Sequence, residues 1–509
     1  MIEAFRSILG EKSVLLDAYK LREAAACTFE THHEILAILY PKNTQQVSEC
    51  LKIASRYETP VYPVSGGKNW GHGSKVPSCN KAILMDLSQM NRIVEFDEKL
   101  AYVTLEPGVT QQQLFDFLEE KKSSLMMGLN GASRFASVMG NALERGDTTG
   151  VYGDRCHAVC ALEVVLPTGE ILHTGFKRFE QAACAYLHKE GVGPDLTGLF
   201  FQSNLGIVTQ MTLWLEPKPK YVGHAIFHIE HENELASVLD ALQQLSLRCT
   251  SVDISLWNDF KVFSRLDQYP FEEANQKTPL PDFLRQKLRK KHRVKKWVGN
   301  IAFFSYNQMQ FWAHRRLIKS FLNPCVHQLS FFKQSGLKGF TPAEFENLPL
   351  AYWRKKTPVP KDPHLDQDGC GLIWLSPLLP FEGSRVTPLL EWVEETILEY
   401  GFEPNLAVLA SRPRTLKLLI GIVYDRDVKD EDHRAWACHQ ELMDELVRQG
   451  YMPYRLGISS MYLMSKGERS FQTVLRQIKQ VVDPRGILAP GRYEGKLHPA
   501  FEKIINRDI

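Results

Sequence analysis

The stretch most suggestive of chemistry is a glycine-rich segment, Pro63-Val-Ser-Gly-Gly-Lys-Asn-Trp-Gly-His-Gly-Ser74. It has four glycines in the eight positions from Gly66 to Gly73 and follows a short apolar strand pattern at 61–64. Without a Cβ atom, the backbone can turn tightly and direct several N–H groups at one ligand. Such amides hold phosphate, so a nucleotide cofactor is one interpretation and an ordinary glycine-rich turn is the other. The spacing fits neither G-x-x-x-x-G-K-[ST] nor a G-x-G-x-x-G that opens a helix.

The elements around this segment predict a mixed α+β domain over residues 1–219. Residues 44–57 have apolar side chains at helical spacing behind a capping Asn43, and a second helix follows the cap Thr110. The segment 216–219 contains two prolines and is interpreted as a linker. Strand patterns occur at 61–64, 82–87, 101–105, 160–166, 170–173 and 207–215.

Beyond the linker, strand and helix patterns alternate and predict a second, α/β domain over residues 220–455. A chain of 509 residues exceeds what one hydrophobic core usually supports, which agrees with two domains. The remaining segment, 456–509, contains a Pro- and Gly-rich stretch that we expect to return to the first domain. Strands are predicted at 225–229, 252–256, 301–306, 372–375, 406–410 and 416–423, and helices at 233–246, 308–322, 387–400 and 432–449.

Composition excludes several classes of protein. With 44% hydrophobic residues, 24% charged residues and a net charge of +2, the chain is expected to be globular and to bind neither nucleic acid nor a membrane surface. No apolar run is long enough to span a membrane, and the N-terminus lacks a secretory signal pattern. The ten cysteines include no C-x-x-C pair, which favours reduced thiols in the cytoplasm and no metal site.

One charge run stands out, with eight Lys or Arg residues between Arg285 and Lys296. A solvated helix or loop is the ordinary interpretation of such a run. A docking surface for an acidic redox partner is the alternative.

Six stretches together resemble a known family. They occur at 64–74, 137–146, 152–154, 163–170, 201–208 and 487–492, in the family's order. The chain resembles the FAD-dependent vanillyl-alcohol oxidase/4-cresol dehydrogenase flavoproteins, in particular the branch that oxidises para-substituted phenols. The resemblance extends from about residue 36 to 493. It implies a two-domain fold, in which 1–219 and 456–509 form a PCMH-type FAD-binding domain and 220–455 form a cap over the flavin.

The resemblance also implies which residues bind FAD. The glycine segment would hold the pyrophosphate, the stretch 137–146 would line the ribityl chain and the flavin, and 206–207 would approach the adenine side. The residues implied are Ser65, Gly66, Gly67, Lys68, Asn69, Trp70, Ser137, Gly140, Asn141, Gly146, Gly206, Ile207 and Arg492. Flavin would carry the redox chemistry and the protein would orient it.

In the phenol-oxidising relatives, a Tyr-Arg pair in the cap binds the phenol oxygen as phenolate, and this chain has Tyr454-Arg455 at the matching place. A guanidinium and a phenol O–H stabilise a phenolate through charge-assisted hydrogen bonds. The phenolate would push electrons through the ring while hydride leaves the para benzylic carbon for flavin N5, giving a quinone methide. A third phenolate-binding tyrosine of the relatives corresponds to His72, whose charge titrates near neutral pH.

The rest of the pocket departs from the family pattern. The catalytic aspartate of the oxidase branch corresponds to Ala132, whereas Asp147 stands where relatives have an apolar residue. Asp147 is interpreted either as a relocated base or ligand, or as a solvated or salt-bridged carboxylate. Thr149 replaces a tyrosine and Ala407 replaces a glutamate, while Trp374 is expected to remain a pocket wall.

The positions at which relatives attach the flavin covalently do not have the family's attachment residues in this chain. The attachment histidine of the oxidase branch corresponds to Leu372, and that of a glycine-segment linkage to Lys68. The cresol enzyme attaches through a tyrosine near the position of His364, which is therefore the one candidate. We expect non-covalent FAD.

Three functions are therefore compared. The first is an FAD-dependent oxidase or dehydrogenase acting on a para-substituted phenol or related aromatic alcohol. The second is a biosynthetic flavoenzyme for a bulkier or non-phenolic metabolite, motivated by His72, Ala132, Asp147 and Ala407. The third is a non-catalytic flavin-binding protein. The resemblance leaves the electron acceptor open between oxygen and a redox protein or quinone, and it implies a homodimer.

Overall fold

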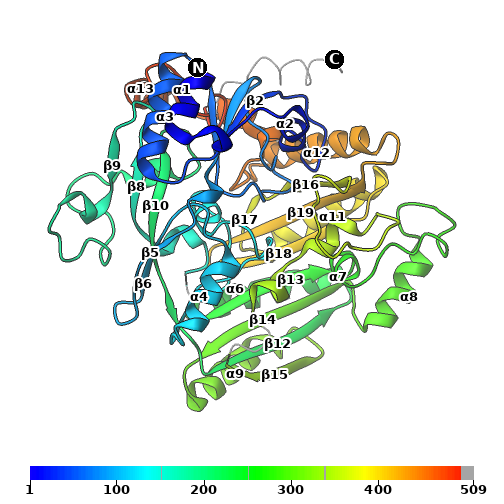
Figure 1. Cartoon of the computed structure of the whole chain (residues 1–509). Coiled ribbons are helices and arrows are strands. Elements are labelled where there is room, and N and C mark those ends of the chain that lie inside the picture. The colour runs from blue at the N-terminus through cyan, green and yellow to red at the C-terminus, as the bar shows by residue number, and fades with distance from the viewer. Residues whose placement is uncertain (151, 250, 337–339, 495–509) are drawn as a thin grey trace.

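The computed structural model describes residues 1–150, 152–249, 251–336 and 340–494 (Figure 1). The first part of the chain forms two sheets and a short strand pair. One sheet has the order β1-β2-β4-β3, with β2, β4 and β3 parallel, and the other is antiparallel with the order β5-β6-β10-β8-β9. Its helices are α1 (Ile2–Leu9), α2 (Ala18–Ala24), α3 (Thr44–Arg56), α4 (Gln111–Glu120) and α5 (Val138–Leu143). Its strands are β1 (Val14–Leu15), β2 (Ile35–Leu39), β3 (Val61–Val64), β4 (Ala82–Asp86), β5 (Ile93–Asp97), β6 (Tyr102–Leu105), β7 (Leu125–Met126), β8 (Val159–Val165), β9 (Ile171–His173), β10 (Ile207–Trp214) and β11 (Glu216–Pro217).

The helix caps follow from the sequence. The Asn43 side chain accepts a hydrogen bond from the Gln46 amide at 2.9 Å and starts α3. The Thr110 hydroxyl accepts from the Gln113 amide at 3.1 Å and starts α4. Each cap satisfies a backbone N–H that has no partner inside its helix, so both predicted starts are confirmed.

The segment interpreted as a linker is in fact part of the fold. Glu216 and Pro217 pair with Met126 and Leu125 as strands β11 and β7, and Glu216 is buried. A proline can occupy this place because the next hydrogen bond of the pair comes from the following residue, where the Lys218 amide donates to the Ser124 carbonyl at 2.7 Å.

The second part is built on one eight-stranded antiparallel sheet with the order β15-β12-β14-β13-β18-β19-β16, in which β17 also pairs with β19. The predicted strands are all present, and β15 and β17 were not predicted. The strands are β12 (Tyr221–Ile229), β13 (Val252–Asn258), β14 (Trp297–Ser305), β15 (Leu329–Ser335), β16 (Cys370–Leu375), β17 (Leu378–Pro380), β18 (Asn405–Arg412) and β19 (Thr415–Asp425). The remaining helices are α6 (Glu232–Arg248), α7 (Asp259–Leu266), α8 (Asp282–His292), α9 (Gln308–Leu322), α10 (Pro342–Phe345), α11 (Gly383–Glu399), α12 (Glu431–Arg448) and α13 (Arg469–Val482).

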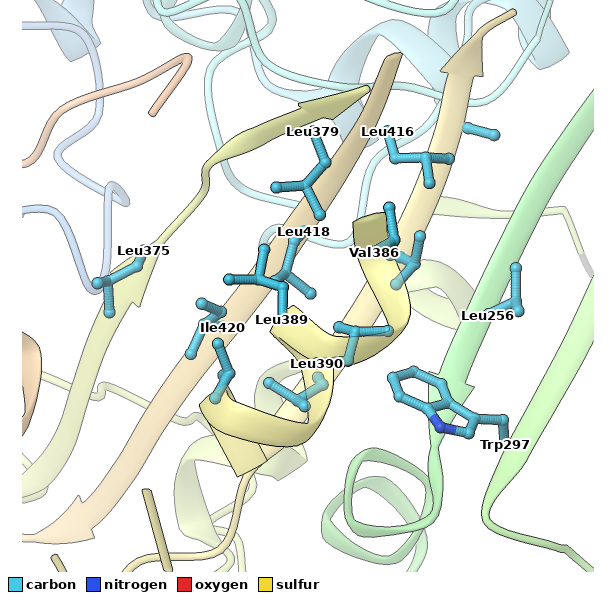
Figure 2. Close-up of a cluster of buried hydrophobic side chains, with 14 of the residues drawn as sticks. Leu256, Trp297, Leu375, Leu379, Val386, Leu389, Leu390, Leu416, Leu418 and Ile420 are labelled. Atoms are coloured by element: carbon cyan, nitrogen blue, oxygen red, sulfur yellow. The ribbon is translucent and has the colours of Figure 1, made fainter. Parts of the chain in front are cut away.

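One face of the large sheet packs against helices α6, α9, α11 and α12. Figure 2 shows part of this core, where Leu416, Leu418 and Ile420 of β19 lie near Leu389 and Leu390 of α11. Each fully buried leucine contributes ~1.5–3 kcal/mol to folding. The opposite face of the sheet is left for a cavity.

Side chains alternate between these two faces along each strand. On β13, Ile254 and Leu256 belong to the helix-facing core, whereas Asp253, Ser255 and Trp257 line the cavity. This is the two-residue period of a strand, and it directs alternate residues of β13 towards the site.

The segment 487–489 lies against the first part of the chain. The Val61 amide donates to the Ile487 carbonyl and the Ala489 amide donates to the Val61 carbonyl, both at 2.8 Å. Nζ of Lys479 on α13 donates to the Leu488 carbonyl at 2.8 Å, which joins this helix to the same segment. Residues 487–489 thus flank β3, directly before the glycine segment.

The basic run forms most of α8 and the loop after it. Arg285 and Arg289 both form ion pairs with the fully buried Asp259, at 2.7 and 2.6 Å. Lys287, Lys291, Lys295 and Lys296 also have acidic partners within the chain. The run therefore stabilises its own part of the fold, and its docking to a redox protein stays a prediction. Within the described ranges, no helix is both long and apolar enough to cross a membrane.

Candidate active site

A continuous cavity of about 760 Å³ lies between the glycine segment and the large sheet. The residues predicted to bind the cofactor all line it: Ser65, Gly66, Gly67, Lys68, Asn69, Trp70, Ser137, Gly140, Asn141, Gly146, Gly206, Ile207 and Arg492. The predicted substrate residues line it as well: His72, Asp147, Thr149, Trp374, Ala407, Tyr454 and Arg455. The fold thus brings together segments that are up to about 400 residues apart in the sequence.

The glycine segment leaves β3 as a loop in which three glycines have positive φ angles, Gly73 with 117° among them. Gly67 and Gly71 have φ angles of 66° and 75°, in the left-handed region. A Cβ atom on Gly71 would lie 2.2 Å from Cδ1 of Trp374, so this glycine also lets the cap approach the loop. The Trp374 amide donates to the Gly71 carbonyl at 3.1 Å.

The backbone amides from Gly66 to Asn69 have no acceptor among the described residues. Buried or half-buried backbone N–H groups almost always find a partner, so four successive free donors at a cavity wall require a ligand or water. A row of amides in a turn binds an anionic oxygen group. The loop therefore fits the pyrophosphate of a dinucleotide.

The stretch after Ser137 completes the cofactor side of the cavity. The Ser137 hydroxyl accepts from the Gly140 amide at 2.9 Å and starts α5. A Cβ atom on Gly140 would lie 2.4 Å from Oγ of Ser65, so the glycine lets α5 pack against the loop. Oδ1 of Asn141 is buried and has no hydrogen-bond partner. Because a buried acceptor without a donor is costly, this atom too fits a bound polar ligand.

A carboxylate from the second part of the chain fixes the loop. Asp366 accepts hydrogen bonds from Nε1 of Trp70 at 3.1 Å and from the Ser74 hydroxyl at 2.8 Å. Burial raises the pKa of Asp366 to about 6, against the effect of these two hydrogen bonds. Sequence reasoning missed this residue, since nothing near it in the sequence marks it as a partner of the loop.

Tyr454 and Arg455 meet the loop at the other side of the cavity. A guanidinium N–H of Arg455 donates to Oδ1 of Asn69, and its Nε lies 3.9 Å from a carboxylate oxygen of Glu144. Nε of Arg455 has no hydrogen-bond partner. Burial raises the pKa of Tyr454, although Lys417 and Arg455 oppose this, so its hydroxyl stays protonated at neutral pH. The pair thus offers one cation and one neutral donor to a ligand.

His72 differs from the expectation that its charge titrates near neutral pH. It is buried, and burial together with the charge of Arg455 lowers its pKa well below the usual value. The imidazole is therefore neutral at physiological pH. Its Nδ1 has no hydrogen-bond partner, which leaves a polar atom for a ligand.

Asp147 is part of an ion-pair cluster. Nζ of the buried Lys417 lies 2.7 Å from Oδ1 of Asp147 and also contacts Asp154. Of the two interpretations of Asp147, the geometry therefore agrees with a salt-bridged carboxylate. The same Nζ lies 4.7 Å from the ring centroid of Tyr454, so the cluster borders the Tyr454-Arg455 pair. Lys417 was not identified from the sequence.

The cap sheet forms the wall of the cavity. Ala407 lies on β18 opposite Trp257 of β13, and Trp374 lies on β16. The Thr149 hydroxyl accepts from the Leu129 amide at 3.1 Å, which ties it to the loop before Ala132. Small residues at 132 and 407 leave room in the cavity.

His364 does not lie in the cavity lining. Its side chain is exposed, and its amide donates to the Asp368 carboxylate at 2.8 Å. Burial of part of the ring lowers its pKa, and the nearby Lys68 adds to this effect.

Comparisons with known proteins were made on sequence and on structure. Residues 35–175 match the family described as "FAD binding domain". The chain is 41% identical to 1'-carboxy-chondrochloren decarboxylase of Chondromyces crocatus, over 97% of this chain and 96% of that protein. It is 28% identical to the flavoprotein subunit of 4-cresol dehydrogenase [hydroxylating] of Pseudomonas putida, over 96% and 94%.

A similar solved structure is that of p-cresol methylhydroxylase with substrate bound. It superposes with a TM-score of 0.88 at 25% sequence identity, covering 97% of this chain and 96% of that one. The whole two-part architecture, and not the cofactor domain alone, is therefore shared.

Proposed function

The chain belongs to the vanillyl-alcohol oxidase/4-cresol dehydrogenase family of FAD-dependent oxidoreductases, and from this we propose that it oxidises a para-substituted phenol or a related aromatic alcohol. The observation that carries the proposal is the position of Arg455. Its guanidinium contacts Asn69 of the glycine loop and lines the same cavity as the cofactor residues. A phenolate bound there would lie beside the site of the flavin.

The chain's own residues would hold the cofactor. The free amides at 66–69 would receive the pyrophosphate, and Asn141 would bond the ribityl chain or the ring with its unpartnered oxygen. When bound, FAD supplies the acceptor for a hydride. In this proposal the FAD is not covalently attached, because the one candidate, His364, is exposed outside the cavity lining.

Arg455 and Tyr454 would stabilise the phenolate. The guanidinium compensates the negative charge, and the protonated Tyr454 hydroxyl donates a second hydrogen bond. A phenolate releases electron density to the para carbon, which favours loss of hydride there and gives a quinone methide. The neutral His72 would donate or accept a hydrogen bond at the ring without adding charge.

The Asp147–Lys417 pair would face the product of this step. A carboxylate beside a quinone methide can take a proton from an adding water molecule. Because Nζ of Lys417 lies 2.7 Å from Oδ1 of Asp147 and already engages this oxygen, we assign Asp147 the orientation of the water molecule.

The experiment replaces Arg455 and measures turnover of a panel of para-alkyl phenols. Arg455→Ala should lower kcat/KM by about a hundredfold or more, since a buried charge-assisted bond is worth ~3 kcal/mol. Arg455→Lys should recover part of the activity, because it restores the charge without the planar fork. Arg448→Ala, at an exposed arginine of α12, is the control. Unchanged turnover of every phenol by Arg455→Ala, with normal flavin content, would refute the proposal.

A second candidate is oxidative decarboxylation, favoured by the identity of 41% to a decarboxylase over nearly the whole chain. Such a reaction can begin with the same loss of hydride at the para benzylic carbon. Loss of CO₂ from the neighbouring carbon would then return the electrons to the ring, leaving a phenolate and an alkene. Release of CO₂ from a 4-hydroxyphenylalkanoate in step with flavin reduction would identify this reaction.

A further inference from the structure

Lys261 is a buried lysine at the wall of the cavity. It lies in the first turn of α7, where the side chain of Asn258 accepts from the Lys261 amide at 3.1 Å. Lys261 is only 5% exposed, and its Nζ lies 5.4 Å from the ring centroid of Trp374 and 5.6 Å from that of Trp257. The ammonium group therefore lies between two indole rings that line the cavity.

Its ammonium group has no acidic partner. Nζ donates to Oδ1 of Asn405 at 3.1 Å, and no carboxylate of the described residues lies within ion-pair distance. An ammonium has three N–H groups, so most of its donor capacity is unused by the protein.

The other buried lysines show how unusual this is. Lys355, Lys417 and Lys479 are equally buried, and each has a carboxylate oxygen within 2.8 Å. Burying a cation without a counter-ion costs several kcal/mol, so such a site is kept where a ligand supplies the missing charge. Among the buried lysines in the described part of the chain, Lys261 is the one without a carboxylate partner.

A second cation lies one turn further along the same helix. Arg265 lines the same cavity, and its guanidinium is held by Oδ1 of Asn347 at 3.0 Å and by the Glu344 carbonyl at 2.8 Å. It too has no carboxylate within ion-pair distance in the described ranges. Burial and the charge of Arg265 together lower the pKa of Lys261 to about 7.

The acidic groups of the cavity do not compensate these two cations. Glu144 pairs with Arg492, and Asp147 pairs with Lys417. Burial raises the pKa of Asp253 well above its usual value, which disfavours its charged form. Glu344 is an exposed residue, and its carboxylate accepts a hydrogen bond from the Thr341 hydroxyl. This end of the cavity therefore carries a net positive charge.

We propose that Lys261, assisted by Arg265, binds a carboxylate on the substrate. The inference rests on the proposed function, because it concerns the same cavity. Trp374 connects the Arg455 end of the cavity with the Lys261 end. Its amide donates to Gly71 of the glycine loop, and Asn69 of the same loop accepts a hydrogen bond from Arg455. Its ring lies beside Nζ of Lys261. The substrate is accordingly an aromatic acid, with the phenol oxygen at Arg455 and the carboxylate at Lys261.

The test compares binding of acids with that of their uncharged amides to the flavin-loaded enzyme. The probes are 4-hydroxyphenylalkanoates of increasing chain length, the corresponding amides, and phenylalkanoates that lack the hydroxyl group. Calorimetry is carried out about one pH unit below the pKa of Lys261, which is about 7, so that about nine-tenths of the lysine is charged. The best acid should bind about tenfold tighter than its amide, and Lys261→Met should reduce this ratio to within about twofold. Lys261→Arg should retain most of the preference.

The controls separate this inference from the proposed function. Lys287→Met, at an exposed lysine of α8, should change nothing, and Lys261→Met should leave the Kd of the amides and the flavin content unchanged. The phenylalkanoates test the carboxylate site even if no phenol is oxidised. Equal binding of acid and amide by the unsubstituted enzyme at every chain length would overturn the inference, whatever the activity towards neutral phenols. Loss of turnover of neutral phenols in Lys261→Met, with the acid preference intact, would also overturn it and point to proton transfer instead.

Discussion

Lys417 is a buried cation beside the Tyr454-Arg455 pair. It is 5% exposed, ion-pairs with Asp147 at 2.7 Å and contacts Asp154 as well. Burial is the largest single effect and favours the neutral amine, but Asp147, Tyr454 and Asp154 together outweigh it and raise the pKa of Lys417. The lysine therefore stays charged over the whole physiological range, and it holds β19 to the loop of the cofactor domain.

We predict that Lys417→Met destabilises the protein by ~3 kcal/mol, because two part-buried carboxylates lose their shared cation. Urea unfolding of the flavin-loaded protein measures this change. Lys466→Met, at a half-exposed lysine, serves as the control and should change stability by less than ~0.5 kcal/mol. A loss no greater than that of the control would show that the cluster contributes little to the fold.

At the scale of elements, one carboxylate joins four segments of the cofactor domain. Glu163 on β8 accepts from the hydroxyls of Thr44 in α3 at 2.7 Å and of Thr209 in β10 at 2.8 Å. Nε2 of His173 on β9 lies 3.3 Å from its other oxygen. Burial alone would raise the pKa of Glu163, but the hydrogen bonds from His173 and the two threonines lower it to about 2.

This depressed pKa predicts a loss of stability in acid. A carboxylate whose folded pKa is lowered stabilises the fold above its unfolded pKa of about 4.5, and that contribution disappears as the pH falls towards 2. Glu163→Gln should therefore cost ~1–2 kcal/mol near neutral pH. The difference between the two proteins should shrink steadily below about pH 5. Urea unfolding at a series of pH values measures it; a difference that does not vary with pH would contradict the prediction.

The elements that could be predicted are those with local signals. Capped helices such as α3 and strands of buried apolar residues follow from spacing alone. The strands β15 and β17 were missed because one is a largely exposed edge strand and the other is three residues long and ends in a proline. The sequence pattern of β11 predicts a linker instead of a strand, because prolines usually end a strand.

The candidate site was predictable only where residue types reveal chemistry. The glycine segment and the Tyr454-Arg455 pair have such signals, and both line one cavity. The neutrality of His72 and the unpaired charge of Lys261 depend on burial by segments far away in the sequence. A sequence does not state which lysine lacks a counter-ion.

At the scale of the whole molecule, the cofactor site is formed by three separate parts of the chain. The glycine loop, the cap sheet and the returning tail all border the cavity, and Arg492 of the tail donates to the Tyr62 hydroxyl at 2.7 Å. A ligand bound there stabilises the arrangement of all three, since it binds the folded state and not the unfolded chain.

We predict that FAD can be removed and that its return restores stability. Acid precipitation should leave the yellow colour in the supernatant, because no covalent bond holds the flavin. Adding FAD to the apoprotein at a hundred times its Kd should stabilise it by about 2.7 kcal/mol, seen as a higher Tm. Colour that stays in the pellet would show a covalent link and direct attention to His364.

The central claim is that the cavity receives a phenolate beside a bound flavin. Its most direct measurement is anaerobic mixing of the flavin-loaded enzyme with para-alkyl phenols and with their O-methyl ethers, while the visible absorbance of oxidised flavin is followed. The account predicts that at least one phenol bleaches the flavin within a single turnover and that its methyl ether, which cannot form a phenolate, does not. Bleaching by phenol and ether at equal rates, or by no phenol at all, would contradict it.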